Sequence, residues 1–191
     1  MDIFLETERL VLRRFAESDL DLLVELDSDP EVMRHLTGRP TKRERIAQKV
    51  LPAILAGYER GLGTFAAHAK PGLEFLGWLE LRPDDGRPAQ VELGYRLRKS
   101  AWGSGYATEG ARALVEYAFT RTATTKIHAE TMAVNSASRR VMEKVGLRYE
   151  STFHEDWKHP LPGAEHGDVR YTLGRAEWYA ASQRKNLQDL S

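Results

Sequence analysis

Residues 102–108 have the sequence Trp-Gly-Ser-Gly-Tyr-Ala-Thr and separate two segments of different hydrophobic period. Before them, Val91 to Arg98 (VELGYRLR) alternates apolar and polar residues, which predicts a strand with one buried face. After them, residues 104–121 carry one apolar stripe at helical spacing, formed by Ala107, Ala111, Leu114, Ala118 and Phe119. Glycines between the two segments let the backbone turn sharply. The sequence therefore predicts a strand, a glycine turn and a helix.

A glycine turn at the start of a helix is suited to an anionic ligand. The N–H groups of the first helical turn have no carbonyl partner within the helix, and the helix dipole adds positive potential there. The same turn could also do no more than cap the helix. A Walker loop requires Gly-Lys-Ser/Thr, which is absent, and a dinucleotide fingerprint requires a small residue where Thr108 stands. Another kind of phosphate-bearing ligand is therefore expected.

The rest of the chain predicts a mixed order of strands and helices. Expected strands are residues 9–15, 64–69, 73–81, 126–132, 149–157 and 168–174, and expected helices follow residue 18 and cover 41–60 and 136–145. Pro52 should kink or divide the second of these helices because proline has no N–H donor. Gly146 is placed for a left-handed C-terminal cap. The fold class predicted is mixed α/β.

Length and composition favour one globular domain. The chain has 191 residues, and we expect a single domain over 1–183 followed by a polar C-terminal tail over 184–191. Lys plus Arg and Asp plus Glu both number 28, so bulk attraction to nucleic acid is not expected. The chain has no cysteine, which excludes a thiolate nucleophile and fits a cytoplasmic protein. Neither a signal peptide nor a membrane span is indicated.

Two blocks of the chain, residues 93–109 and 135–147, are similar to motifs of one enzyme family. Gly105 and Ala107 match the pyrophosphate loop Gln/Arg-x-x-Gly-x-Gly/Ala of the GNAT superfamily of N-acetyltransferases, although Trp102 replaces Gln/Arg. Leu93-Gly94-Tyr95 followed by Trp102 to Glu109 resembles the branch of ribosomal-protein N-terminal acetyltransferases (RimJ/RimL type). Residues 135–147 resemble the family element Asn-x-x-Ser-x-x-Val-x-x-Lys-x-Gly-Phe. The resemblance spans about residues 5–180.

The resemblance implies a fold and a cosubstrate. The expected fold is a mostly antiparallel central sheet of about seven strands flanked by helices, and the expected cosubstrate is acetyl-CoA, with no metal. Backbone donors of the glycine loop would hold the pyrophosphate, and they belong to Gly103, Ser104, Gly105, Tyr106, Ala107 and Thr108. An added-strand pairing with pantetheine and the acetyl carbonyl would use the backbone of Tyr95, Arg96 and Leu97.

Polar side chains complete the cofactor site that the resemblance implies. Asn135 would bind the pantetheine arm, and Ser138 would lie where the thiol emerges. Four basic residues could meet the phosphates or could equally be solvated surface charges: Arg98, Lys99, Arg140 and Lys144.

Acetyl transfer to an amine needs an uncharged nitrogen, donors for the developing negative charge and a proton for the departing thiolate. Many family members supply that proton from a Tyr seven positions after the motif Asn, where this chain has Met142. The resemblance assigns the role to Ser138, for which helix capping is the alternative. Glu92 matches a strand glutamate that serves as base through water in histone-acetylating relatives. A partly exposed sheet carboxylate is its alternative role, and the competing bases are Glu130, His154 and Glu155.

The predicted function is acetyl-CoA-dependent transfer of acetyl to a primary amine, either a protein N-terminus or a small molecule. The alternative is a catalytically silent CoA-binding regulatory module of the same fold. Residues 33–41 and 160–163 are expected to border the acceptor slot. His154, His159 and His166 cluster near that loop, but their spacing matches no standard metal site. The expected assembly is a monomer or homodimer that binds neither nucleic acid nor membrane.

Overall fold

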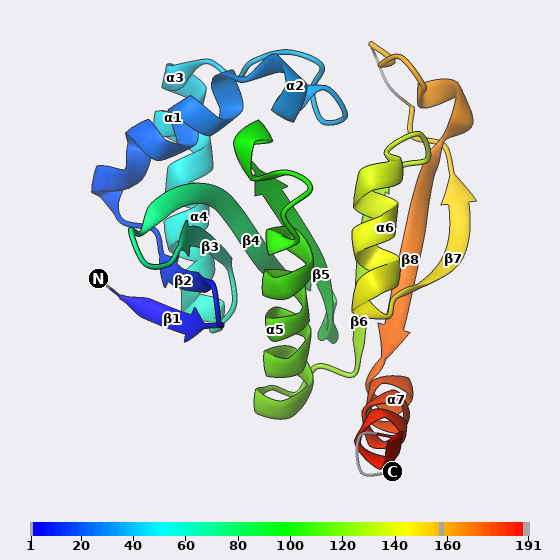
Figure 1. The fold of residues 1–191 in the computed structure, drawn as a ribbon. Coiled ribbons are helices and arrows are strands. Elements are labelled where there is room, and N and C mark those ends of the chain that lie inside the picture. The colour runs from blue at the N-terminus through cyan, green and yellow to red at the C-terminus, as the bar shows by residue number, and fades with distance from the viewer. Residues whose placement is uncertain (1, 157–158, 189–191) are drawn as a thin grey trace.

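The computed structural model describes residues 2–156 and 159–188, which contain one sheet of eight strands in the order β1-β2-β3-β4-β5-β6-β8-β7. All neighbouring strands are antiparallel except the parallel pair β5 and β6 (Figure 1). The strand bounds are Ile3–Glu6 (β1), Leu10–Arg14 (β2), Thr64–Ala69 (β3), Glu74–Asp84 (β4), Arg87–Leu97 (β5), Lys126–Met132 (β6), Arg148–Phe153 (β7) and Asp168–Gly174 (β8). The mixed, mostly antiparallel sheet is confirmed. It has one strand more than expected, because the four-residue strand β1 was not predicted.

Helices cover the two faces of this sheet (Figure 1). One layer contains α1 (Leu20–Ser28), α2 (Pro30–Met33), α3 (Arg43–Arg45) and α4 (Leu51–Gly57). The other contains α5 (Tyr106–Arg121) and α6 (Ser136–Val145), and α7 (Arg175–Gln188) follows β8. None of these helices is long and apolar enough to span a membrane.

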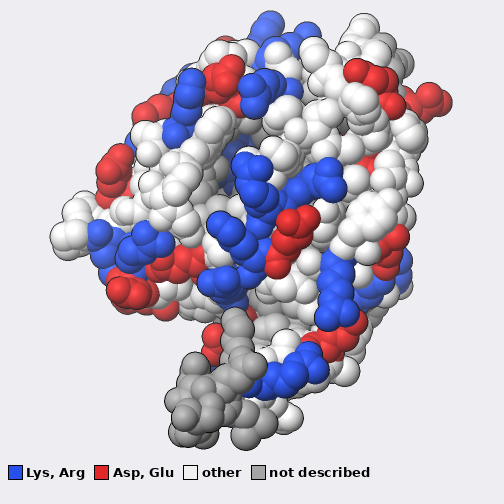
Figure 2. Space-filling model, turned by 45° about the vertical axis from the view of Figure 1, so that its right-hand side comes forward, with Lys and Arg blue, Asp and Glu red and all other residues white. Residues whose placement is uncertain are grey.

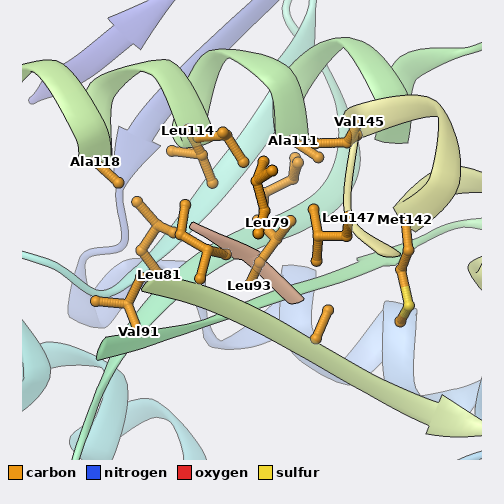
Figure 3. Close-up of a cluster of buried hydrophobic side chains, with 14 of the residues drawn as sticks. Leu79, Leu81, Val91, Leu93, Ala111, Leu114, Ala118, Met142, Val145 and Leu147 are labelled. Carbon is orange, nitrogen blue, oxygen red and sulfur yellow. The ribbon is translucent and has the colours of Figure 1, made fainter. Parts of the chain in front are cut away.

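Strand alternation explains why both faces are covered. Leu79 and Leu81 of β4 and Leu93 of β5 turn towards α5, where they pack against the helix's apolar stripe (Figure 3). The alternate position of β4, Trp78, packs against the α1–α4 layer. The same alternation places the polar residues of both strands on the α1–α4 face, among them Glu80 and Glu92.

Three local features differ from the sequence predictions. A π-helical turn, Ile46–Val50, precedes α4 and brings Pro52 into the first turn of that helix, where its missing N–H is tolerated. The last helix, α7, extends to Gln188, so residues 184–188 of the predicted polar tail are helical. β7 ends at Phe153, earlier than predicted, and residue 157 lies outside the described residues.

The feature that positions the site is the divergence of β5 from β6. Their pairing joins Gln90 to Lys126, Val91 to Ile127 and Glu92 to His128, and β5 then continues to Leu97. Beyond Glu92, β5 is therefore hydrogen-bonded through β4 on one side only, within the part of the chain that the structure describes. An unpaired strand edge inside a sheet can bind an extended ligand as if it were another strand.

Candidate functional site

A cleft of about 520 Å³ lies where β5 and β6 diverge. Residues of β4, β5, the segment after α2, the glycine loop, the start of α5 and α6 form its walls. A second hollow, of about 680 Å³, is formed by the β4–β5 turn and the C-terminal end of α5. The cleft combines the open edge of β5 with the glycine loop, so it is the candidate site.

The glycine loop has the backbone shape expected for a phosphate-binding turn. Gly103 and Gly105 have φ angles of 74° and 85°, in the left-handed region that favours glycine. Gly105 directly precedes α5, so the first-turn N–H groups of Tyr106, Ala107 and Thr108 have no partner within the helix. All three residues line the cleft. Figure 2 shows basic side chains gathered on one face of the molecule, and Arg140 and Lys144 contribute to the cleft lining.

The N-terminal strands brace this loop through Arg9. Its Nη1 donates to the carbonyl oxygen of Ser104 at 3.0 Å, and its guanidinium lies 4.7 Å from the centre of the Tyr106 ring. Glu109 of α5 accepts hydrogen bonds from Arg9 Nε and from Thr7 Oγ1, each at 2.6 Å. Burial by itself would raise the pKa of the Glu109 carboxyl, but these hydrogen bonds hold that pKa below its ordinary value.

The open edge of β5 presents the backbone of Tyr95 and Leu97. Arg98 N–H donates to Leu76 O of β4 at 2.8 Å, and backbone groups alternate sides along a strand, so those of Arg96 also face β4. Those of Tyr95 and Leu97 face the cleft, and Trp102 Nε1 donates to Leu97 O at 2.8 Å. Arg96 lines the cleft with its side chain instead.

Arg98, one of the four basic residues considered for the phosphates, is paired with an acid of another element. Its guanidinium donates to Glu25 Oε2 at 2.6 Å and lies 5.2 Å from the centre of the Phe75 ring. Its guanidinium therefore contacts the α1 layer. Ser104 is exposed and uses its backbone carbonyl to hold Arg9.

Asn135 and Ser138 meet at the start of α6. Asn135 Oδ1 accepts the N–H of Ser138 at 3.2 Å, so Asn135 caps the helix, and its Nδ2 donates to Thr131 Oγ1 at 3.0 Å. The Tyr95 hydroxyl lies 3.0 Å from both the carbonyl oxygen and Oγ of Ser138. Burial raises the pKa of Tyr95 to about 12. Met142 is 2% exposed and packs in the core, as Figure 3 shows.

Two of the four candidates for the base line the cleft and form ion pairs. Glu92 is bonded to Arg82 of β4, and Glu130 Oε1 accepts from Arg170 Nε at 2.6 Å. The other two candidates, His154 and Glu155, are exposed after β7.

Glu80 and His35, two residues of the cleft whose pKa values are shifted, were not singled out from the sequence. Glu80 Oε2 accepts from Thr64 Oγ1 at 2.8 Å, and burial raises the pKa of this carboxyl. Burial lowers the pKa of His35, whose Nδ1 is buried without a partner in the described part of the chain. Glu80 stands out only because it lies opposite Gly94, and that pairing is known only once the strand register is known. His35 lies within residues 33–41, the segment predicted to border the acceptor slot, but it was not singled out there.

The two segments expected at the acceptor slot are adjacent. A Cβ atom at Gly38 would lie 2.5 Å from Leu161 Cδ2, so the chain after α2 touches the loop between β7 and β8. In that loop His154 Nε2 lies 3.4 Å from Glu165 O, and His166 Nε2 lies 3.7 Å from Glu165 Oε1. No group of three His, Asp or Glu side chains suited to a metal ion occurs within residues 2–156 and 159–188.

Comparison with known proteins adds family evidence to this geometry. Residues 9–148 match the family model described as an acetyltransferase (GNAT) domain. The FsC-acetyl coenzyme A-N(2)-transacetylase of Aspergillus fumigatus is 38% identical over 183 residues, which cover 91% of this chain and 77% of that protein.

Solved structures of similar fold include two complexes with coenzyme A. One is RimL, a ribosomal L7/L12 α-N-protein acetyltransferase, with a TM-score of 0.76 and 20% identity over 91% of this chain and 98% of that one. The other is spermidine N-acetyltransferase from Vibrio cholerae with CoA and spermine, with a TM-score of 0.75 and 15% identity over 91% and 99% of the two chains. At these identities the likeness concerns the fold.

Proposed function

The chain belongs to the acetyltransferase (GNAT) family and is an acetyl-CoA-using N-acetyltransferase, and on this premise we propose that it acetylates the primary amine of a small molecule in the β5–β6 cleft. The observation that carries the proposal is the combination, in one cleft, of an open strand edge, a helix N-terminus and a hydroxyl at Ser138. Acetyl-CoA supplies an activated acetyl group as a thioester.

The residues of the cleft fit a long ligand with phosphates at one end. N–H groups of the glycine loop and of the first turn of α5 would hold the pyrophosphate, with Lys144 as a nearby positive charge. The backbone of Tyr95 and Leu97 would pair with the pantetheine arm and the acetyl carbonyl, and Asn135 would lie beside that arm. Ser138 would give a proton to the departing sulfur.

The acceptor enters from the opposite face of the sheet in this proposal. Tyr95 and Leu97 turn their side chains towards α5 and α6, on the side of the glycine loop. Glu80, Glu92 and Glu130 lie on the other face, towards the α1–α4 layer. Carboxylates on that face would attract an ammonium group and would help to remove its proton.

The small-molecule acceptor is favoured by the most informative named relative. The Aspergillus protein is 38% identical to this chain, and its name places the acetyl group on a nitrogen designated N(2). A protein N-terminus is the second candidate, because residues 93–109 resemble the RimJ/RimL branch. The catalytically silent alternative is not retained, since the family and the named relative are those of active acetyltransferases.

The test is release of CoA from acetyl-CoA, followed with a thiol reagent, in the presence of different amines. The chain contains no cysteine, so its own thiols give no background. We suggest two isomeric amides, norleucinamide with an α-amine and 6-aminohexanamide with a terminal amine, together with spermidine, an aminoglycoside and short N-terminal peptides. Faster release with a small amine than with any peptide is expected. Release with peptides alone would move the assignment to the second candidate.

A further inference from the structure

Glu80 occupies a space that exists only because residue 94 is glycine. The two residues face each other in the β4–β5 register. A Cβ atom at Gly94 would lie 2.7 Å from Glu80 Oε1 and 2.9 Å from its Cγ, which is too close for a side chain. The carboxylate therefore lies over the backbone of β5, directly before Tyr95 on the open edge. This is the position from which a base could reach an amine at the cleft.

The contacts of Glu80 leave it able to accept a proton. Its Oε2 accepts a hydrogen bond from the hydroxyl of Thr64 on β3, at 2.8 Å, which stabilises the ionised carboxylate. Glu92, in contrast, is bonded to the Arg82 guanidinium, and protonation of Glu92 would have to disrupt that ion pair. Glu130 is held in the same way by Arg170.

We propose that Glu80 removes the proton from the acceptor ammonium, and that Glu92 tunes it as a neighbouring negative charge. This inference rests on the proposed function and names the base for it. Burial raises the pKa of Glu80, the Thr64 hydrogen bond opposes that rise, and the charge of Glu92 adds to it. A carboxylate whose pKa is raised in this way is a better general base near neutral pH than a carboxylate with an ordinary pKa.

Charged groups surround Glu80 from each neighbouring element. Arg82 on its own strand and Arg96 on β5 both favour the ionised form, whereas Glu92 on β5 opposes it. Arg96 is itself paired with Asp27 of α1 and lies 5.0 Å from the centre of the Trp78 ring. From the segment after α2, His35 lines the same cleft and is the rival titrating group.

The proton balance of the step is complete. Glu80 takes one proton from the ammonium, and the freed nitrogen forms a bond to the acetyl carbon. The carbon–sulfur bond breaks with its electron pair on sulfur, Ser138 gives its proton to that sulfur, and Ser138 recovers a proton from the nitrogen. Glu80 then releases its proton to solvent. Ammonium and thioester become amide, thiol and one free proton.

The test compares pH profiles of kcat/KM for wild type and Glu80→Gln with 6-aminohexanamide and norleucinamide. We expect Glu80→Gln to lower kcat/KM by about 10²-fold or more and to replace the acid limb set by Glu80 with one set by ionisation of the amine itself. The loss should be larger for 6-aminohexanamide, because a terminal amine near pKa 10.4 depends more on a base than an α-amine near 8 does. Acetyl-CoA affinity and melting temperature should stay close to wild type.

Two further variants keep the Glu80 carboxylate and should shift the acid limb of the kcat/KM profile in opposite directions. Thr64→Val removes the hydrogen bond to the ionised Glu80 and should move the acid limb to higher pH. Glu92→Gln removes a negative neighbour and should move it to lower pH. His35→Gln should leave the limb in place. These shifts decide the question even if Glu80→Gln folds poorly.

Different failures have different meanings. A limb and rate that survive in Glu80→Gln, or a limb that disappears in Glu92→Gln or His35→Gln, would overturn the role of Glu80 while leaving the acetyltransferase intact. If wild-type protein releases no CoA with any of the amines tested, the proposed function itself is contradicted, and the role of Glu80 with it.

Discussion

The hydroxyl oxygens of Tyr95 and Ser138 lie 3.0 Å apart, so strand β5 and helix α6 meet at two hydrogen-bonding groups. If Tyr95 donates to Ser138 Oγ, the serine proton is free to point into the cleft. If Tyr95 donates to the carbonyl of Ser138, which is also 3.0 Å away, the serine proton points at Tyr95. The hydrogen bond of Tyr95 thus determines where the proton of Ser138 is directed. This matters because Met142, at the position of the usual proton-donating tyrosine, has no proton to give.

Ser138→Ala should lower kcat by about 10²-fold or more and leave acetyl-CoA affinity within about twofold, since a general acid contributes to the chemical step. Steady-state CoA release and calorimetric binding measure the two quantities. Ser136→Ala is the matched control, because Ser136 is exposed on the same helical turn. Equal turnover in wild type and Ser138→Ala would remove the serine from the mechanism.

Tyr95→Phe should lower kcat by about tenfold through loss of the hydroxyl that positions Ser138. The double variant with Ser138→Ala should be no slower than Ser138→Ala alone, because the two residues act as a unit. Additive losses would show that Tyr95 acts independently of Ser138.

The raised pKa of Tyr95 also makes a prediction about alkaline pH. Because its folded pKa is about 12 and the ordinary value is 10.0, Tyr95 stabilises the fold fully below pH 10, and this contribution is lost as the pH rises towards 12. An ultraviolet tyrosinate titration of wild type should therefore contain a late component that is smaller in Tyr95→Phe, where Tyr58, whose pKa burial also raises to about 12, still contributes. A difference spectrum that titrates near pH 10 would contradict the burial argument.

Gly105→Trp should abolish measurable acetyl-CoA binding, because the new side chain would stand in the glycine loop and force a strained φ of 85°. Gly86→Trp is the control, since Gly86 has a similar φ of 78° but lies at the β4–β5 turn with open space around its Cβ position. Both variants lose stability, and only the first should lose the ligand. Unchanged affinity in Gly105→Trp would place the phosphates elsewhere.

Glu109→Gln should lower the free energy of unfolding at pH 7 by about 1–2 kcal/mol, the scale of hydrogen bonds to a charged group. The pKa of Glu109 is depressed in the fold, so its stabilising effect is present above its ordinary value of 4.5 and fades as the pH falls. Chemical denaturation at pH 7 and pH 3 checks this. A difference between wild type and variant that is as large at pH 3 as at pH 7 would contradict it.

The sequence was informative where local pattern and local structure agree. The glycines at 103 and 105, the apolar stripe of α5 and the cap at Gly146 follow from short-range chemistry, and the structure contains all three. β1 was missed because a four-residue edge strand is too short to show alternation. The π-helical turn before Pro52 depends on how that segment packs, which a hydrophobic pattern does not contain.

The candidate site was predictable only where residues act through the backbone or a motif. Glu80 was missed because a glutamate on an alternating strand is most often solvated. Only its register opposite Gly94 shows that its carboxylate fills the space left by the missing side chain of residue 94. Arg98 was predicted either to meet the phosphates or to be a surface charge, and its pairing with Glu25, distant in the chain, was not foreseen. Such long-range pairings are set by tertiary packing, which sequence spacing does not reveal.

The most direct test is single-turnover transfer from radiolabelled acetyl-CoA, with excess enzyme and either norleucinamide or 6-aminohexanamide. The account predicts that label passes to the amine in one step, without labelled protein, and that Gly105→Trp transfers none. Label that accumulates on the protein, or that stays on CoA with every amine, would contradict direct acetyl transfer in the β5–β6 cleft.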